Sequence, residues 1–78
     1  MTTIQFFDTF DRTKHLIEEL CLQYGFKNEW EKIFVYRKWR RQLQIERVLN
    51  DIWFRMPDKV NVANNTPGWC ELINLIEK

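Results

Sequence analysis

A block of cations interrupts the apolar pattern of the central part of this chain. Residues 37–41 read Arg-Lys-Trp-Arg-Arg, within a segment whose apolar residues repeat every three to four positions. If residues 29–56 formed one helix, the apolar stripe would comprise Trp30, Ile33, Phe34, Ile45, Val48, Leu49, Ile52 and Met56, and Arg37, Lys38 and Arg41 would interrupt it. Burying unpaired charge is costly. Either the chain bends at this block, or this surface meets something other than the core.

The length of the central segment also favours a break. A continuous helix over residues 29–56 would be about 42 Å long at 1.5 Å per residue. A globule of this chain length has a radius of gyration of about 11.5 Å, hence a diameter of about 30 Å. We therefore expect a long central helix that either protrudes or is kinked or broken near residues 36–40. The β-branched and aromatic run at residues 33–36 leaves a short strand as an alternative there.

The flanking segments carry helix signals of their own. Residues 3–24 have one apolar face at 3.6-residue spacing, which predicts an amphipathic helix. Asp8 or Thr9 is its candidate N-cap, and Gly25 is the expected stop. Asn28 is the candidate N-cap of the central segment, which ends at Pro57.

The C-terminal part divides into a polar stretch and a last helix. Residues 58–65 are mostly polar and are predicted to form a loop or a brief extended piece. Thr66 followed by Pro67 is typical of a helix start, because proline is favoured at the first helical position. The sequence thus predicts a single all-α domain over residues 1–78, with three to four helices and a long or kinked central helix. Trp30, Trp53 and Trp69 are expected to contribute to its core.

The chain lacks the residues that most catalytic or metal sites need. It contains no serine, and His15 is its one histidine. Cys21 and Cys70 belong to no Cys-x-x-Cys pair, and three possible Cys/His ligands are fewer than a structural zinc site needs. Gly25 and Gly68 are too far apart for a phosphate-binding loop. We expect no enzyme activity, no cofactor and no metal, and we interpret both cysteines as small buried hydrophobic residues, with a disulfide as the alternative.

Charge is unevenly distributed along the chain. The formal net charge is +1, but residues 27–47 contain seven Lys/Arg and three Glu, a local charge of +4 that leaves −3 for the rest. Such segregation can create a directional field on a nearly neutral protein. The sequence opens with no signal-peptide pattern and has no apolar run long enough to span a membrane. The expected setting is therefore the cytoplasm, with no membrane partner.

The basic block is also the best candidate for a binding surface. Tyr36, Trp39 and Leu43 would share a helix face nearly opposite the main stripe, and Trp and Arg are common anchors of protein interfaces. The candidate partner-binding residues are Tyr36, Arg37, Lys38, Trp39, Arg40, Arg41 and Leu43. Two purely structural interpretations remain open. In the first, the Arg stems pack over the core; in the second, the cations form ion pairs with Asp8, Asp11 and Glu18.

These features suggest a small non-enzymatic protein that binds another protein through the central helix, as an adaptor, accessory subunit or inhibitor, with self-association also possible. The alternative is a small nucleic-acid-binding regulator that uses residues 37–41, because guanidinium groups contact phosphates and aromatic rings stack on bases. A helix-turn-helix with its turn at Gly25 is disfavoured, since recognition helices contact bases through their N-terminal residues. Here those residues include Glu29 and Glu31.

Overall fold

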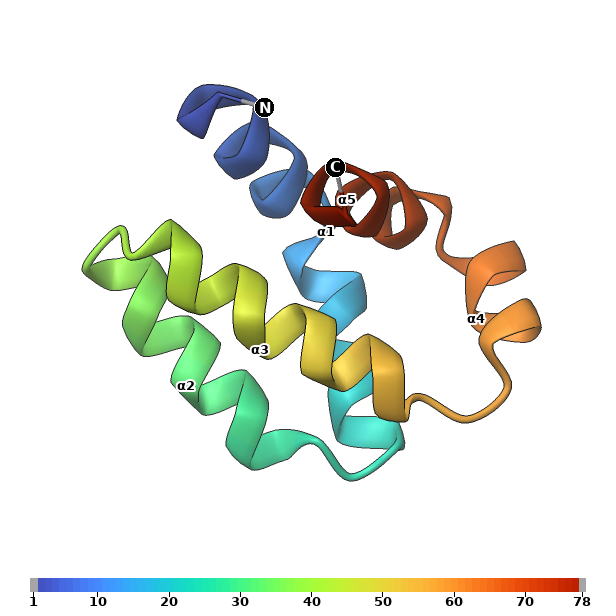
Figure 1. The fold of residues 1–78 in the computed structure, drawn as a ribbon. Helices are drawn as coiled ribbons and strands as arrows, with labels where there is room; N and C mark the ends of the chain where they lie inside the picture. Colours follow the sequence, from blue (N-terminus) through green and yellow to red (C-terminus); the bar gives the residue numbers. More distant parts are fainter. Residues whose placement is uncertain (1, 78) are drawn as a thin grey trace.

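The computed structural model describes residues 2–77, and this part of the chain is all-helical (Figure 1). Its five helices are α1 (Thr3–Gln23), α2 (Lys27–Lys38), α3 (Gln42–Arg55), α4 (Lys59–Asn65) and α5 (Pro67–Glu77). The predicted all-α class is confirmed, but the predicted count of three to four helices was too low.

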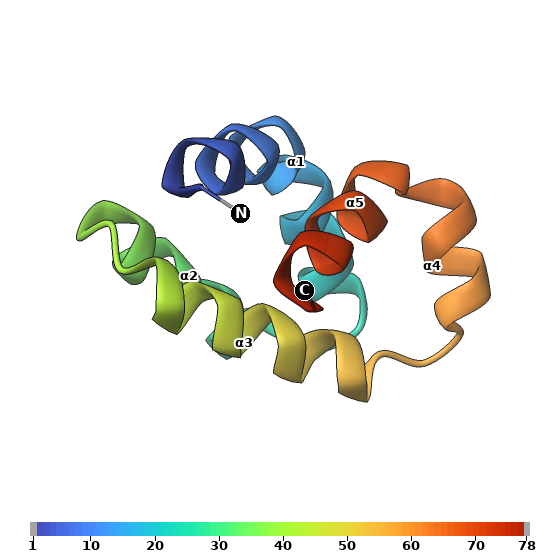
Figure 2. The same cartoon turned by 45° about the horizontal axis from the view of Figure 1, so that its top comes forward.

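The helices form two pairs with α4 at one end. Helices α2 and α3 run antiparallel as a hairpin, and α1 packs against both α2 and α5 (Figures 1 and 2). Helix α4 lies at the periphery and leads into α5. In both views the first turns of α1 lie at the same end of the molecule as the turn between α2 and α3.

The core is built from aromatic and branched aliphatic side chains of all five helices. The largest fully buried side chains are Trp69, Phe6, Phe10, Ile17, Ile33, Ile45, Leu49, Ile52 and Leu72. Trp30 is also buried, and Trp53 is partly buried with its ring centroid 6.0 Å from that of Trp69. All three predicted tryptophans therefore contribute to the core or its edge, where each large ring removes much apolar surface from water.

The single long or kinked central helix is replaced by two helices. Helix α2 ends at Lys38 and α3 begins at Gln42, so the break lies where the length argument predicted it. Arg40 adopts a left-handed conformation with φ of 53°, and the Arg41 amide donates to the Tyr36 carbonyl at 2.9 Å. The molecule measures 29 × 24 × 19 Å, which a straight 42 Å helix would exceed. The short strand considered at residues 33–36 is wrong, because these residues are helical.

Two of the predicted helix starts are wrong. Helix α1 begins earlier than Asp8 or Thr9, because Thr2 and Gln5 form a reciprocal capping box with bonds of 2.9 and 3.1 Å. Helix α2 begins at Lys27 rather than after Asn28. The stop at Gly25 is confirmed by its φ of 85°, which favours glycine.

The polar stretch before the last helix is a helix rather than a loop. Helix α4 buries Val62, whose amide hydrogen-bonds to the Asp58 carbonyl at 3.1 Å. One buried valine stabilises this short helix through tertiary contact, which sequence periodicity over seven residues does not reveal. The start of α5 at Pro67 is confirmed.

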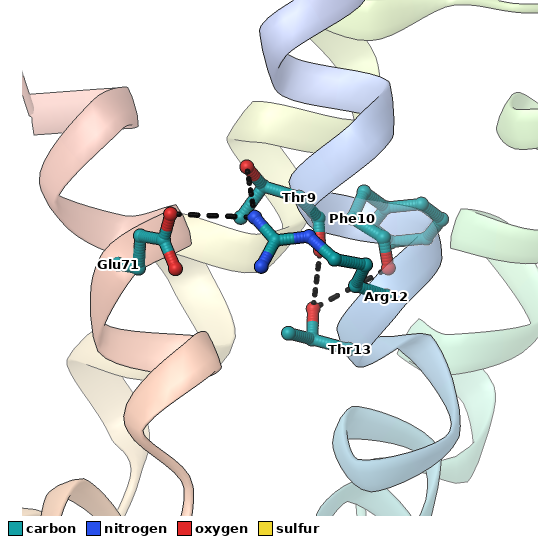
Figure 3. A network of polar contacts seen from close by, with 5 residues as sticks. All are labelled: Thr9, Phe10, Arg12, Thr13 and Glu71. Atoms are coloured by element: carbon teal, nitrogen blue, oxygen red, sulfur yellow. Dashed lines mark hydrogen bonds and ion pairs between the residues drawn. The ribbon is translucent and has the colours of Figure 1, made fainter.

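A polar network joins α5 to α1 (Figure 3). The buried Thr13 hydroxyl donates to the Thr9 carbonyl at 2.9 Å, and Arg12 reaches Glu71 of α5 at 3.4 Å. Beside this network Gly68 packs so closely on Thr13 that a Cβ atom at residue 68 would collide with the Thr13 Cγ2 methyl. This contact fixes the distance between the two helices.

Over residues 2–77, no helix has the length and apolar content that crossing a bilayer requires.

Candidate functional site

Arg37, the first cation of the basic block, makes contacts within the protein. Its guanidinium forms a two-pronged contact with the Asp11 carboxylate of α1, with Nε to Oδ1 at 3.0 Å and the second nitrogen to Oδ2 at 2.9 Å. This hydrogen bonding lowers the pKa of Asp11 below its ordinary value. The same guanidinium carbon lies 4.7 Å from the centroid of the Phe7 ring. Arg37 therefore joins α2 to α1.

The ion-pair interpretation thus holds for Asp11 and not for the other two predicted acids. Glu18 instead accepts a hydrogen bond from the Trp30 indole nitrogen at 2.7 Å. Asp8 belongs to none of the ion pairs formed within residues 2–77.

Arg40 and Tyr36 also contact the body of the protein. The Arg40 guanidinium carbon lies 4.7 Å from the centroid of the Phe7 ring, so Phe7 is contacted by two cations. Each such cation–π contact at an accessible site is worth about 0.5–1 kcal/mol. Tyr36 is half-buried and packs against the core. These contacts hold the turn between α2 and α3 against α1.

The other candidate residues are exposed at that turn. We define the α2–α3 tip as Lys38, Trp39, Arg40, Arg41 and Leu43, all of which are exposed. The Trp39 side chain is 68% exposed and Leu43 is 58% exposed. The single helix face predicted for Tyr36, Trp39 and Leu43 does not form, because α2 ends at Lys38 and α3 begins at Gln42. The seven residues of the predicted site are thus the five residues of the tip plus Tyr36 and Arg37.

The structure reveals a second surface, which the sequence did not indicate. Phe34 was predicted to lie in the core stripe, but it is 67% exposed, and this prediction was wrong. It lies one residue from the fully buried Ile33, a rotation of about 100° around the helix, which turns it toward solvent. Phe34, Val35 and Leu22 border the same open groove between α1 and α2.

This α1–α2 groove has an apolar floor and charged edges. Its volume is about 550 Å³, and its lining residues are Glu18, Leu22, Lys27, Trp30, Glu31, Phe34 and Val35. A smaller hollow of about 180 Å³ adjoins it and shares Glu18, Trp30 and Phe34. The groove therefore offers apolar contact beside one cation, Lys27, and two carboxylates, Glu18 and Glu31.

Cys21, Cys70 and His15 lie in three different environments. Cys21 is fully buried, and burial raises the pKa of its thiol to about 12, so the reactive thiolate is suppressed near neutral pH. Cys70 is half-buried, and both cysteines are free. His15 borders the smaller hollow next to Lys14. Among the side chains of residues 2–76, no three His, Cys, Asp or Glu are grouped as metal ligands would be.

No protein-family model matches the chain, and no curated protein or solved structure is significantly similar to it. Function is therefore inferred from the residues and their geometry.

Proposed function

We propose that this chain is a small non-enzymatic protein that acts by binding another protein through the α2–α3 tip. The observation that carries the proposal is the 68% exposure of Trp39, beside Leu43, on a turn that Arg37 and Arg40 hold against α1. Exposing an indole ring to water is unfavourable, and Trp and Arg dominate the energetics of protein interfaces. An anchored turn also loses little conformational freedom on binding.

The charge of the tip indicates the chemistry of the partner. Lys38, Arg40 and Arg41 are the charged residues of the tip, and no acidic residue lies between positions 38 and 43. A complementary partner surface has an apolar pocket for Trp39 and carboxylates at the rim of that pocket. The attraction between these carboxylates and the cations of the tip would also speed association. An adaptor, an accessory subunit or an inhibitor would each use such a surface. Lack of enzyme activity and a cytoplasmic setting are further parts of this proposal.

A nucleic-acid-binding regulator is the second candidate. The exposed cations Lys38 and Arg41 beside an exposed indole favour it, because this combination suits contact with phosphates and stacked bases. Arg37 argues against it, since its guanidinium is already engaged by Asp11. A smaller set of available cations predicts weak and salt-labile association.

The test compares two double variants in affinity capture with a tagged protein. Trp39→Ala with Arg41→Glu removes the apolar anchor and reverses one charge at the tip. Phe54→Ala with Arg47→Glu makes the same two changes elsewhere on α3, where Phe54 is 82% exposed and shares an open pocket with Arg47. All four side chains are exposed, so circular dichroism should show both variants folded.

We expect the tip variant to lose a partner that the Phe54 variant retains. Losing a hot-spot tryptophan costs about 2 kcal/mol or more, which corresponds to a decrease of about thirtyfold in affinity. Capture should survive nuclease treatment and moderate salt. Equal capture by both variants would refute the proposal, and capture lost on nuclease treatment would favour the nucleic-acid alternative.

A further inference from the structure

The outer face of α2 presents a stripe of exposed side chains. Lys27, Glu31, Phe34 and Lys38 recur at spacings of four, three and four residues, which places them on one side of the helix. All four are exposed, as is Val35 beside them. Phe34 and Val35 are 67% and 51% exposed, and Leu22 of α1, at 54%, borders the same groove.

The charges of this stripe form none of the ion pairs between the side chains that the structure describes. Those pairs join Arg12 to Glu71, Arg37 to Asp11, and Arg55 to both Glu29 and Asp51. Glu31 lies three residues before Phe34, and Lys38 lies three residues after Val35. The two opposite charges are thus placed symmetrically about the midpoint between Phe34 and Val35.

That symmetry matches a second copy of the same helix running in the opposite direction. If two α2 helices pack antiparallel about a twofold axis at this midpoint, Glu31 of each copy lies level with Lys38 of the other. The Phe34 rings then face each other on one side of the seam, and the Val35 side chains face each other on the other side. A twofold contact requires this kind of self-complementary patch, in which residue i meets residue j and j meets i.

We propose that the chain forms a homodimer through antiparallel packing of α2 on α2, with Phe34 at its centre and two Glu31–Lys38 ion pairs between the copies. The inference goes beyond the proposed function, and its surface, centred on Phe34 and Val35, shares only Lys38 with the α2–α3 tip. A strongly acidic or basic partner fits this face less well, because its charges have both signs in a pattern that complements itself.

The apolar patch is small, and this sets the strength of the contact. Leu22, Phe34 and Val35 supply less apolar surface than the roughly 800 Å² per partner of a standard stable interface. We therefore expect a weak, reversible dimer. It forms in concentrated solution and dissociates on dilution.

Charge exchange between copies tests the dimer and its register together. Sedimentation equilibrium is measured on the wild type, on Glu31→Lys, on Lys38→Glu, on the double variant with both changes, and on an equimolar mixture of the two single variants. In either single variant both ion pairs become like-charge pairs. In the mixture and in the double variant, opposite charges face each other again.

We expect the wild type to form a dimer whose fraction rises with concentration. In each single variant the dimerisation affinity should fall about tenfold or more, because each change acts twice by symmetry. The mixture and the double variant should regain dimerisation close to the wild-type level. Phe34→Ala should abolish it, whereas Trp39→Ala, a change at the tip, should leave it unchanged. Circular dichroism confirms that each variant is folded.

Two outcomes would overturn the inference. A wild type that remains monomeric at the highest concentrations means that no second copy occupies this face. Dimerisation that persists in both single variants, or that the mixture does not restore, shows that the copies do not associate in this register. Because partner capture is tested with changes at Trp39 and Arg41, and dimerisation with changes at Glu31, Phe34 and Lys38, the two losses are scored separately.

Discussion

Replacing Gly68 by alanine tests the close contact between α5 and α1 at Thr13. Gly68 is helical and lies beside Thr13, which is 5% exposed. A methyl group at residue 68 would overlap the Thr13 Cγ2 methyl. Rotation of Thr13 is opposed by its hydroxyl, which donates to the Thr9 carbonyl at 2.9 Å and is 3.3 Å from the Phe10 carbonyl (Figure 3). The new methyl therefore forces either the loss of these bonds or a shift of α5.

The expected cost follows from these two routes. Inserting an extra methyl into a tight contact destabilises a protein by about 1–3 kcal/mol. Leaving a buried hydroxyl without its partner costs a similar amount, about 1–3 kcal/mol. Alanine lowers the conformational entropy of the unfolded chain, which offsets about 0.4–1 kcal/mol. We expect Gly68→Ala to lower the free energy of unfolding by about 1–2 kcal/mol.

A matched second change separates the collision from other causes. Thr13→Ser removes the Cγ2 methyl but keeps the hydroxyl and its bonds to α1. Alone it should cost about 1 kcal/mol, because one buried methyl group is lost. In the double variant the alanine methyl enters the space left by Cγ2, so the double variant should be more stable than the sum of the single effects by about 1–2 kcal/mol.

Urea unfolding followed by tryptophan fluorescence and circular dichroism gives all three free energies. Because Trp69 follows Gly68 and is fully buried, its fluorescence should report the unfolding of this region. Additive effects, within about 0.5 kcal/mol, would refute the collision. A Gly68→Ala variant as stable as the wild type would refute it as well.

Two further predictions concern the anchoring ion pair and the buried thiol. Both Asp11 and Arg37 are partly solvent-exposed, so a double-mutant cycle on the pair should give a coupling of about 0.5–1 kcal/mol at neutral pH. The folded-state pKa of Asp11 is below its ordinary value of 3.8, so this contribution is complete above that value and is lost as the pH falls through the folded pKa. Acid denaturation of the wild type and Asp11→Asn should therefore converge at low pH, and a difference that grows on acidification would contradict the pairing. In a Cys70→Ala variant, Cys21 should resist thiol reagents at pH 8 and react only in denaturant. The reason is that the Cys21 thiol is fully buried and its pKa is about 12. Labelling of Cys21 at the rate of an exposed thiol would contradict its burial.

The elements predicted well from the sequence are those with local signals. Helix α1 has a long apolar face and a glycine stop at Gly25, and α5 begins at the Thr66–Pro67 pair. A break between α2 and α3 was one of the alternatives that the basic block and the chain length favoured, since a straight helix over residues 29–56 would exceed a globule of this size. Such signals depend on residues close in sequence or on the overall size, and both can be evaluated without coordinates.

The features missed from the sequence depend on contacts between distant residues. Helix α4 relies on burial of Val62, and the outward position of Phe34 depends on where α1 lies relative to α2. Arg37 lies in the interrupted stripe because Asp11, 26 positions earlier, meets it there. Periodicity gives the face of a helix but not the neighbour that the face meets, so these pairings could not be selected from several plausible alternatives.

The basic block itself divides into residues that the fold explains and residues that it does not. Arg37 and Lys38 lie in the last turn of α2, where positive charge interacts favourably with the helix dipole. Arg41, in contrast, is the N-cap of α3 and makes no capping hydrogen bond through its side chain. Positive charge is unfavourable at a helix N-terminus, where Ser, Thr, Asp or Asn would stabilise the helix. Trp39 likewise exposes an indole ring on the same turn. Neither feature stabilises the fold, which is why the proposed binding test changes Trp39 and Arg41 together.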